Sequence, residues 1–193
     1  MQKIFDAKTT PKEYHRQGKN FPFPKLNSCP CCKKPIPPEK NGFYQRNARD
    51  GEFSEKILIR RYWCIYCRTT ISLLPSFCLP RYQNTLKIVF AAIQRLIGLE
   101  WKPGDCLKVF AEEYPSLFLQ RQHLEFYVRR FFKNTNRIKL GLRQLISDVE
   151  LPPEGDKKEA QKILRIVSGG FKKIHAFSQR FFEQCNFSFM ASR

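Results

Sequence analysis

Two Cys-x-x-Cys pairs constrain this chain more than any other feature, one at Cys29 and Cys32 and the other at Cys64 and Cys67. Such a pair on a tight turn points both thiolates at one metal ion, and two turns together complete a tetrahedral four-sulfur site. The spacing therefore predicts one zinc ion bound by these four cysteines. Four thiolates leave no open position for a substrate, so the predicted role of the zinc is structural.

The other four cysteines do not show a metal-binding spacing. Cys31 lies inside the first pair and could replace one of its two cysteines as a ligand. If it does not, we interpret it as a small buried hydrophobe, as we do Cys78, Cys106 and Cys185. A redox dithiol is the other reading of a Cys-x-x-Cys pair, but it usually occurs singly beside a βαβ pattern, which this sequence lacks.

Alternating apolar residues around the two pairs predict strands over residues 42–47, 56–63 and 69–74, with a turn at Arg49-Asp50-Gly51-Glu52. Together they indicate a zinc β-ribbon over residues 29–80, preceded by a polar N-terminal extension over residues 1–28. The apolar patch of such a ribbon is small. We therefore expect the metal to contribute much of its folding free energy, about 10 kcal/mol or more for structural zinc.

The chain after Pro80 has helical periodicity and predicts an all-helical domain over residues 81–150. The expected elements are a helix over residues 85–98, a short helix capped by Asp105, a helix starting at Ser116 and another near residues 137–147. Long helix, short helix, turn and basic helix is an order typical of a helix-turn-helix, although three packed helices can equally be a plain bundle.

The last segment, residues 151–193, reads as a linker, Leu151-Pro152-Pro153-Glu154-Gly155, and a closing pair of helices over residues 156–168 and 171–185. The predicted fold class is therefore α+β, with an N-terminal zinc ribbon and an all-helical domain that contains a candidate helix-turn-helix.

The chain carries a formal net charge of +18, and its Lys and Arg residues are spread along its whole length. Such an excess attracts polyanions through the release of condensed counterions, which favours nucleic acid as the partner over solubility alone or anionic lipid. On the ribbon, the predicted phosphate contacts are Arg60, Arg61 and Arg68, which could also form an ordinary solvated strand face. On the predicted recognition helix, the outward residues are Gln122, His123, Arg129, Arg130 and Lys133.

Several function classes are disfavoured by what the sequence does not contain. No apolar run approaches the ~18 to 20 residues of a membrane span, and the first residues lack the apolar core of a secretory signal, so we expect a cytoplasmic protein. Acidic residues are sparse, and neither a phosphate-binding glycine loop nor a Ser-His-Asp arrangement occurs. The sequence therefore does not predict an enzyme.

The first pair, Cys29-Pro-Cys-Cys32, and the stretch IRRYWCIYCRTTISLLPSFCLP over residues 59–80 resemble a bacterial family of short zinc-ribbon proteins. These are related to the N-terminal zinc-binding module of insertion-sequence transposases. The resemblance covers residues 29–82 well and residues 85–133 loosely. It implies the same four cysteine ligands, DNA binding, association with mobile elements and no catalysis. The chain departs from the family where Lys33 and Ile65-Tyr66 replace glycines that are common in such knuckles.

The functional expectation is a DNA-binding protein that acts on duplex DNA as a mobile-element accessory protein or a transcriptional regulator. One alternative is a protein-interaction module that docks on a transposase or a polymerase subunit. A second is a zinc ribbon that binds RNA.

Overall fold

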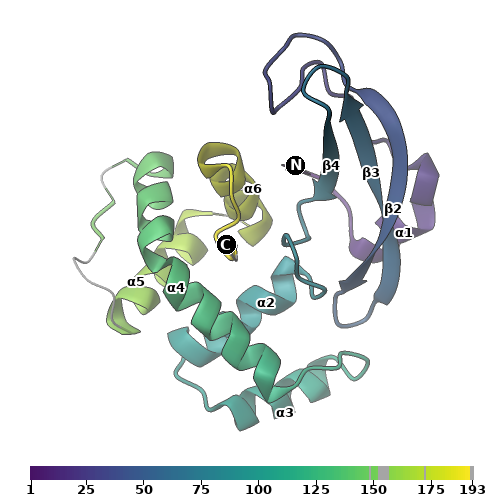
Figure 1. The fold of residues 1–193 in the computed structure, drawn as a ribbon. Helices are drawn as coiled ribbons and strands as arrows, with labels where there is room; N and C mark the ends of the chain where they lie inside the picture. The colour runs from purple at the N-terminus through teal and green to yellow at the C-terminus, as the bar shows by residue number, and fades with distance from the viewer. Residues whose placement is uncertain (148, 152–156, 172, 192–193) are drawn as a thin grey trace.

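The computed structural model describes residues 1–147, 149–151, 157–171 and 173–191. A four-stranded sheet stands at one side of the molecule and the larger helices pack together at the other (Figure 1). We call residues 1–78 the sheet half and residues 79–191 the helical half, because the buried side chains divide into two clusters at this point. The predicted α+β class is thus confirmed.

The three predicted strands occur and extend beyond their expected ends. They are β2 (Glu39–Arg49), β3 (Ser54–Cys64) and β4 (Thr69–Pro75), joined as an antiparallel meander. Between β2 and β3 the chain turns through Gly51, whose φ of 78° is open to glycine and strained for other residues. On β3 and β4, Ile57, Ile59, Ile71 and Leu73 are fully buried. Alternating apolar positions therefore set the strands, as the sequence predicts.

Residues 1–28 are more than the extension that the sequence suggested. They contain β1 (Gln2–Phe5), α1 (Pro11–Gln17) and the short 3₁₀ helix η1 (Gly18–Asn20). Strand β1 pairs in parallel with β4, which gives the sheet order β1-β4-β3-β2. The buried Tyr14 of α1 donates a hydrogen bond of 2.8 Å to the carbonyl of Leu58. The sheet half consequently has a larger core than the ribbon residues alone could supply.

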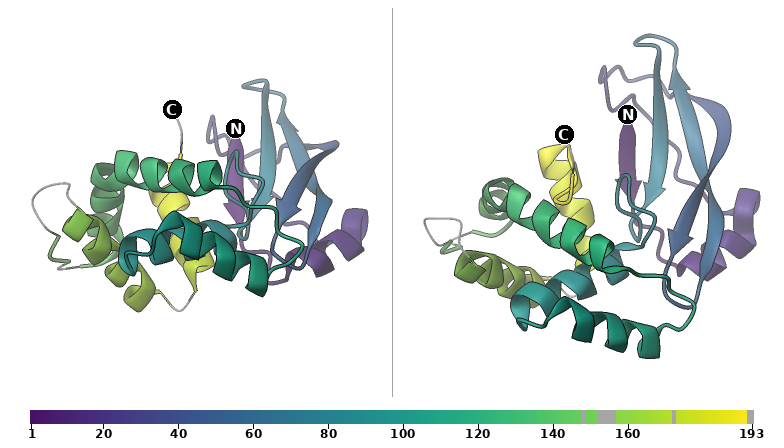
Figure 2. Two further views of the ribbon diagram at one scale, coloured as in Figure 1. Left: turned by 90° about the horizontal axis from the view of Figure 1, so that it is seen from below. Right: turned by 60° about the horizontal axis from the view of Figure 1, so that its bottom comes forward.

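The helical half contains six helical segments within the described residues (Figures 1 and 2). They are α2 (Leu86–Ile93), its π-helical continuation η2 (Gln94–Gly98), α3 (Pro103–Glu113), α4 (Arg121–Leu145), α5 (Lys157–Gly170) and α6 (Ile174–Cys185). The closing pair, α5 and α6, was predicted; the linker residues 152–155 lie outside the described residues. Buried phenylalanines of α6 and its flanks, Phe171, Phe177, Phe181 and Phe189, lie within ring contact of one another.

Helix α4 replaces two helices that the sequence analysis expected. It is a single helix of 25 residues and passes without a break through Asn134 and Thr135. Such residues often end a helix because their side chains compete for backbone hydrogen bonds. Here the side-chain amide of Asn134 donates a hydrogen bond to the backbone carbonyl of Ala191. The hydroxyl of Thr135 donates one to the backbone carbonyl of Phe132. The competing groups are thus satisfied, and the helix continues.

The predicted starts of two helices were wrong. Helix α3 begins at Pro103, a residue suited to the first helical position, and Asp105 lies in its first turn instead of capping it. Ser116 caps no helix, because its hydroxyl donates to the carbonyl of Gly51 in the sheet half. The chain from Tyr114 to Gln120 is therefore held in an irregular path. It is longer than the roughly three or four residues that join the helices of a helix-turn-helix.

Polar contacts join the two halves. The guanidinium of Arg46 on β2 donates to the carbonyls of Leu79 and Tyr82, where the helical half begins. The hydroxyl of Thr85 hydrogen-bonds Asp50 in the β2–β3 turn. On the other side, α6 lies beside β1, and its Phe182 packs against the sheet-half core. These contacts fix the orientation of the basic helix α4 relative to the cysteine pairs.

Candidate metal centre and basic surface

The four predicted cysteines converge at one end of the sheet half. Their sulfur atoms all lie within 4.8 Å of one another. Cys29 Sγ is 3.7 Å from Cys67 Sγ, and Cys32 Sγ is 3.7 Å from Cys64 Sγ. These separations exceed the ~2.05 Å of a disulfide bond. The two turns therefore bring together four thiols that could hold one metal ion.

Matching backbone turns position the two pairs. In the first, the amide of Lys33 donates to the carbonyl of Cys29 at 2.9 Å. The residue directly after each pair has a left-handed backbone, with φ of 61° at Lys33 and 50° at Arg68. Glycine adopts this conformation without steric strain, which explains why it is common in such knuckles. The knuckle shape is thus kept despite the missing glycines, with a cation at the strained position of each turn.

The thiols of Cys32 and Cys67 have pKa values shifted in opposite directions. A hydrogen bond with Thr69 is the main reason that the pKa of the Cys67 thiol falls to about 6. A backbone hydrogen bond at Lys34 lowers the pKa of Cys32, but burial and the other three thiols outweigh it and raise this pKa to about 11. A metal ion must therefore displace protons from part of the cluster, so its affinity for the cysteines rises with pH.

The remaining cysteines lie apart from this cluster. Cys31 is exposed and points its thiol toward the Thr69 hydroxyl, with 3.9 Å between sulfur and oxygen. It was expected to be buried if it was not a ligand, and that expectation was wrong. Cys78 and Cys106 are buried as predicted, and burial raises the pKa of both thiols to about 11. Cys185 is half-buried in the helical half.

The predicted arginines of the ribbon have different surroundings. Arg60 is half-buried on β3, where its guanidinium lies over the rings of Phe43 and Tyr62 at 4.6 and 5.6 Å. Arg61 is also half-buried, and its Nε has no hydrogen-bond partner among the described residues. Arg68 is exposed beside the metal-binding cysteines. Of the three, Arg68 has the most accessible charge.

The aromatic residues of the ribbon strands, Tyr44, Tyr62 and Trp63, differ in exposure from the apolar side chains of the knuckles, which the sequence analysis did not identify. Tyr62 is buried, and the other two are half-buried. In contrast, Ile65 and Tyr66, between the cysteines of the second pair, are 52% and 47% exposed. Lys34 lies 4.3 Å above the Tyr66 ring. Ile65 and Tyr66 therefore belong to a surface on which cations and apolar groups lie side by side.

Helix α4 carries a basic face that was only partly predicted. Gln122, Arg129 and Lys133 are exposed, and Arg130 is half-buried with its guanidinium 5.2 Å from the centre of the Phe126 ring. Because α4 is continuous, Arg137 and Arg143 join the same helix. We call the set Arg129, Arg130, Lys133, Arg137 and Arg143 the basic face of α4.

Charges that would oppose this face are few. Glu125 is the only acidic residue of α4, and it pairs with Arg121 at 2.7 Å. Lys139, by contrast, is buried and pairs with the fully buried Glu159 of α5, so its charge is withdrawn from the surface. His123 is also engaged, because its Nδ1 accepts the backbone N–H of Gln120 at 3.0 Å and thereby caps α4. The capping role leaves His123 a poor base-reading residue.

No helix within the described residues is long and apolar enough to cross a lipid bilayer.

Comparison with known proteins gives one match. A family model described as a domain of unknown function, DUF6431, matches residues 29–102. The match begins at Cys29, the first of the four clustered cysteines, includes β2, β3, β4 and α2, and ends before α3. No curated protein and no solved structure matches the chain. The similarity thus covers the knuckles and the start of the helical half, and its description assigns no function.

Proposed function

We propose that this protein binds duplex DNA and that one structural zinc ion holds the end of its sheet half. The basic face of α4 carries the proposal. It places five cations on one helix whose single acidic residue is already paired. Neutralising DNA phosphates releases counterions and gives binding that weakens steeply with salt.

The identity of the metal is argued from the sulfur positions. Four thiolates at the usual Zn–S distance of ~2.3 Å define a tetrahedron with edges of about 3.8 Å. The Cys29–Cys67 and Cys32–Cys64 sulfur separations, both 3.7 Å, agree with that edge. Four cysteines would fill all the positions of a tetrahedral ion, so the proposal gives the metal a structural role and assigns no catalysis to it. Iron also accepts four thiolates, and elemental analysis of the purified protein distinguishes the two metals.

On DNA, we assign phosphate contacts to Lys133, Arg137 and Arg143, with Arg68 contributing from the knuckles. Gln122, Arg129 and Arg130 are of the residue types that read adenine and guanine edges in the major groove. The long connection before α4 means that this helix would enter DNA from a scaffold other than a standard helix-turn-helix. In this reading, the protein serves as a mobile-element accessory protein or a transcriptional regulator.

The test measures binding to a labelled duplex over a salt series from about 50 to about 300 mM. We expect log K to fall linearly with log salt, and the double variant Arg129→Ala/Lys133→Ala to reduce the slope by up to about 2. The matched control is Lys12→Ala/Lys19→Ala, which removes two exposed charges at α1 and η1, on the far side of the sheet from the helices. A salt-independent affinity, or equal losses in both variants, would contradict the proposal.

A second function is favoured by the apolar knuckle surface at Ile65 and Tyr66, which suits docking on a protein such as a transposase or polymerase subunit. Under that alternative, Tyr66→Ser would abolish the protein complex and leave duplex affinity unchanged. A single-stranded RNA competitor added to the duplex assay addresses the third reading. If RNA displaces the duplex at lower concentration than unlabelled duplex does, RNA is the preferred ligand.

A further inference from the structure

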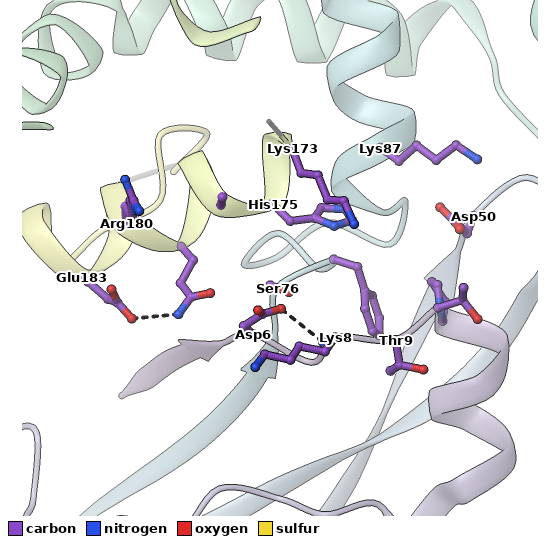
Figure 3. A pocket seen from close by; sticks show the side chains of 15 residues that line it. Asp6, Lys8, Thr9, Asp50, Ser76, Lys87, Lys173, His175, Arg180 and Glu183 are labelled. Atoms are coloured by element: carbon purple, nitrogen blue, oxygen red, sulfur yellow. Dashed lines mark hydrogen bonds between the residues drawn. The ribbon is translucent and has the colours of Figure 1, made fainter. Parts of the chain in front are cut away.

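A cavity of about 870 Å³ lies where the two halves of the molecule meet. Figure 3 shows its two walls. The helical half contributes Lys87 from α2 and Lys173, His175 and Arg180 from the start and middle of α6. The sheet half contributes the segment after β1, including Asp6 and Lys8, as well as Ser76 and Asp50. The cavity is separate from both the metal centre and the basic face of α4.

The cations that line the cavity form no ion pair within the described residues, although Lys87 Nζ lies 5.2 Å from the centre of the Tyr114 ring, whereas the lining carboxylates already have hydrogen bonds. The ion pairs between described residues include none of the four lining cations, Lys8, Lys87, Lys173 and Arg180. In contrast, Asp6 accepts the backbone N–H of Lys8, Asp50 hydrogen-bonds Thr85, and Glu183 accepts from Gln179. Four cations from three segments, none of them in an ion pair between described residues, line this one cavity and favour an anionic ligand.

His175 adds an uncharged hydrogen-bonding group. Its Nε2 is buried and has no partner among the described residues. Burial is the main reason that the pKa of His175 is lowered, with Lys173 and Lys87 acting in the same direction and Asp50 and Asp6 against it. Lys173 and His175 both extend from α6 toward the sheet half in Figure 3. An incoming oxygen would thus meet an ammonium group and a neutral imidazole together.

We propose that this cavity binds a nucleotide. Lys87 and Lys173 would contact the phosphate oxygens, with His175 Nε2 hydrogen-bonding one of them. Asp6 would accept hydrogen bonds from the sugar hydroxyls or the base amino group, a role that carboxylates play in other nucleotide sites. The ligand contacts both halves and so stabilises their arrangement.

Size and charge select this class of ligand. Small-molecule sites usually have volumes of about 300 to 1,000 Å³, and this cavity lies near the upper end of that range. A lone phosphate would fill little of it. A nucleotide carries phosphate at one end and hydrogen-bond donors at the other, which matches a cavity lined by both cations and carboxylates.

The first experiment titrates the full-length, metal-loaded protein with ATP, AMP and tripolyphosphate at physiological salt by calorimetry. We expect saturable one-to-one binding of ATP and a loss of affinity of about tenfold or more in Lys87→Ala/Lys173→Ala. The control Lys158→Ala/Lys162→Ala removes the same charge from exposed positions of α5, outside the cavity, and should change the affinity by less than about twofold. Absence of saturable ATP binding, or equal losses in both variants, would overturn the proposal.

The variant Asp6→Asn is expected to change the affinities for tripolyphosphate and ATP in opposite directions. Removing one carboxylate should strengthen tripolyphosphate binding by relieving repulsion, whereas ATP should lose the acceptor for its sugar or base and bind several-fold more weakly. The amide can still accept the Lys8 N–H, which keeps the local turn. If both ligands bind more tightly to the variant, the cavity takes polyanions in general and the assignment to nucleotides is wrong.

The remaining arm separates a free nucleotide from a nucleotide unit of a strand, and separates this site from the DNA surface. A short single-stranded oligonucleotide that competes with ATP would identify a strand as the source. Failure to compete would identify a free nucleotide. The α4 variant Arg129→Ala/Lys133→Ala should keep its ATP affinity, because neither residue lines the cavity. Loss of ATP binding in that variant would show that the ATP signal comes from the basic face.

Discussion

The sheet half and the helical half are stabilised in different ways. At the knuckle end of the sheet half, Ile36, Ile65 and Tyr66 are exposed around the four cysteines, so little apolar surface is buried there. The helical half instead surrounds a continuous core that includes the phenylalanines of α6. Under the proposed function, a metal ion held by the four cysteines would supply, at the knuckle end, stability that apolar burial supplies in the helical half. This difference predicts that the two halves respond differently to the same kind of perturbation.

The largest expected difference follows removal of the metal. Cys64→Ser deletes one ligand, and we expect the stoichiometric metal to be lost, together with a contribution on the order of 10 kcal/mol to folding of the sheet half. Hydrogen exchange should become fast in β2, β3 and β4 while the cores of α4 and α6 stay protected. The residues of β1 and α1 that enlarge the sheet-half core reduce this effect at the end far from the knuckles.

The control for this variant is Cys31→Ser, which changes a neighbouring exposed thiol outside the four-sulfur cluster. It should keep one metal ion per chain and an unchanged melting curve. Metal retained by Cys64→Ser, or lost from Cys31→Ser, would show that the ligand set is different. Uniform loss of protection throughout the chain would mean that the halves do not differ as proposed.

An intermediate effect is expected in the helical core, where α4 and α6 touch at Gly141. A Cβ added there would lie 2.2 Å from Cε2 of Phe181, so the ring would have to move within a packed core. Gly141→Ala should therefore lower the free energy of unfolding by about 1 to 3 kcal/mol, as overpacking does, without changing metal content. Urea unfolding monitored by circular dichroism measures the change.

Gly104→Ala is the matched control, because nothing lies within 4 Å of an added Cβ there. Alanine in helix α3 should leave stability unchanged or raise it by up to about 1 kcal/mol. If both substitutions have the same effect, close packing of α4 against α6 is not what stabilises this half.

The smallest effect concerns the left-handed residues of the knuckles. Arg68→Gly relieves the strain of a φ of 50° and should stabilise the metal-bound sheet half by about 1 kcal/mol. The same change removes an exposed cation and should weaken duplex binding at low salt. Thermal melting and the duplex assay, each compared with Lys34→Gly, separate the two consequences, since Lys34 does not have a positive φ. Stability that falls in Arg68→Gly would contradict the strain argument.

Local patterns explain what could be predicted of the fold and site. The cluster of four cysteines was predicted from spacing alone, because two residues between cysteines suffice to close a turn that could hold a metal ion. Strands β2, β3 and β4 were found from alternation, and α5 and α6 from helical periodicity. Each of these signals lies within a short stretch of chain, where backbone geometry restricts the choices.

Features that depend on distant residues were missed. Pairing of β1 with β4 joins residues far apart in sequence. The Ser116 hydroxyl donates to the carbonyl of Gly51, also far away in sequence, so local sequence does not show that Ser116 caps no helix. The continuity of α4 was also missed, and within it the Asn134 side chain donates to the carbonyl of Ala191, 57 residues further along the chain. The cavity between the halves has no sequence signature, because its lining comes from five separate segments.

The sequence by itself determined which four cysteines cluster, the order of the strands β2 to β4 and the positive charge, since these follow from spacing, alternation and composition. The tertiary structure decided which cations reach the surface and what they face. Lys139 is buried against Glu159, Arg129 and Lys133 remain exposed on α4, and Lys87 and Lys173 line a cavity between the halves. The reason is that a side chain's surroundings are set by packing between remote segments, which composition and local periodicity do not contain.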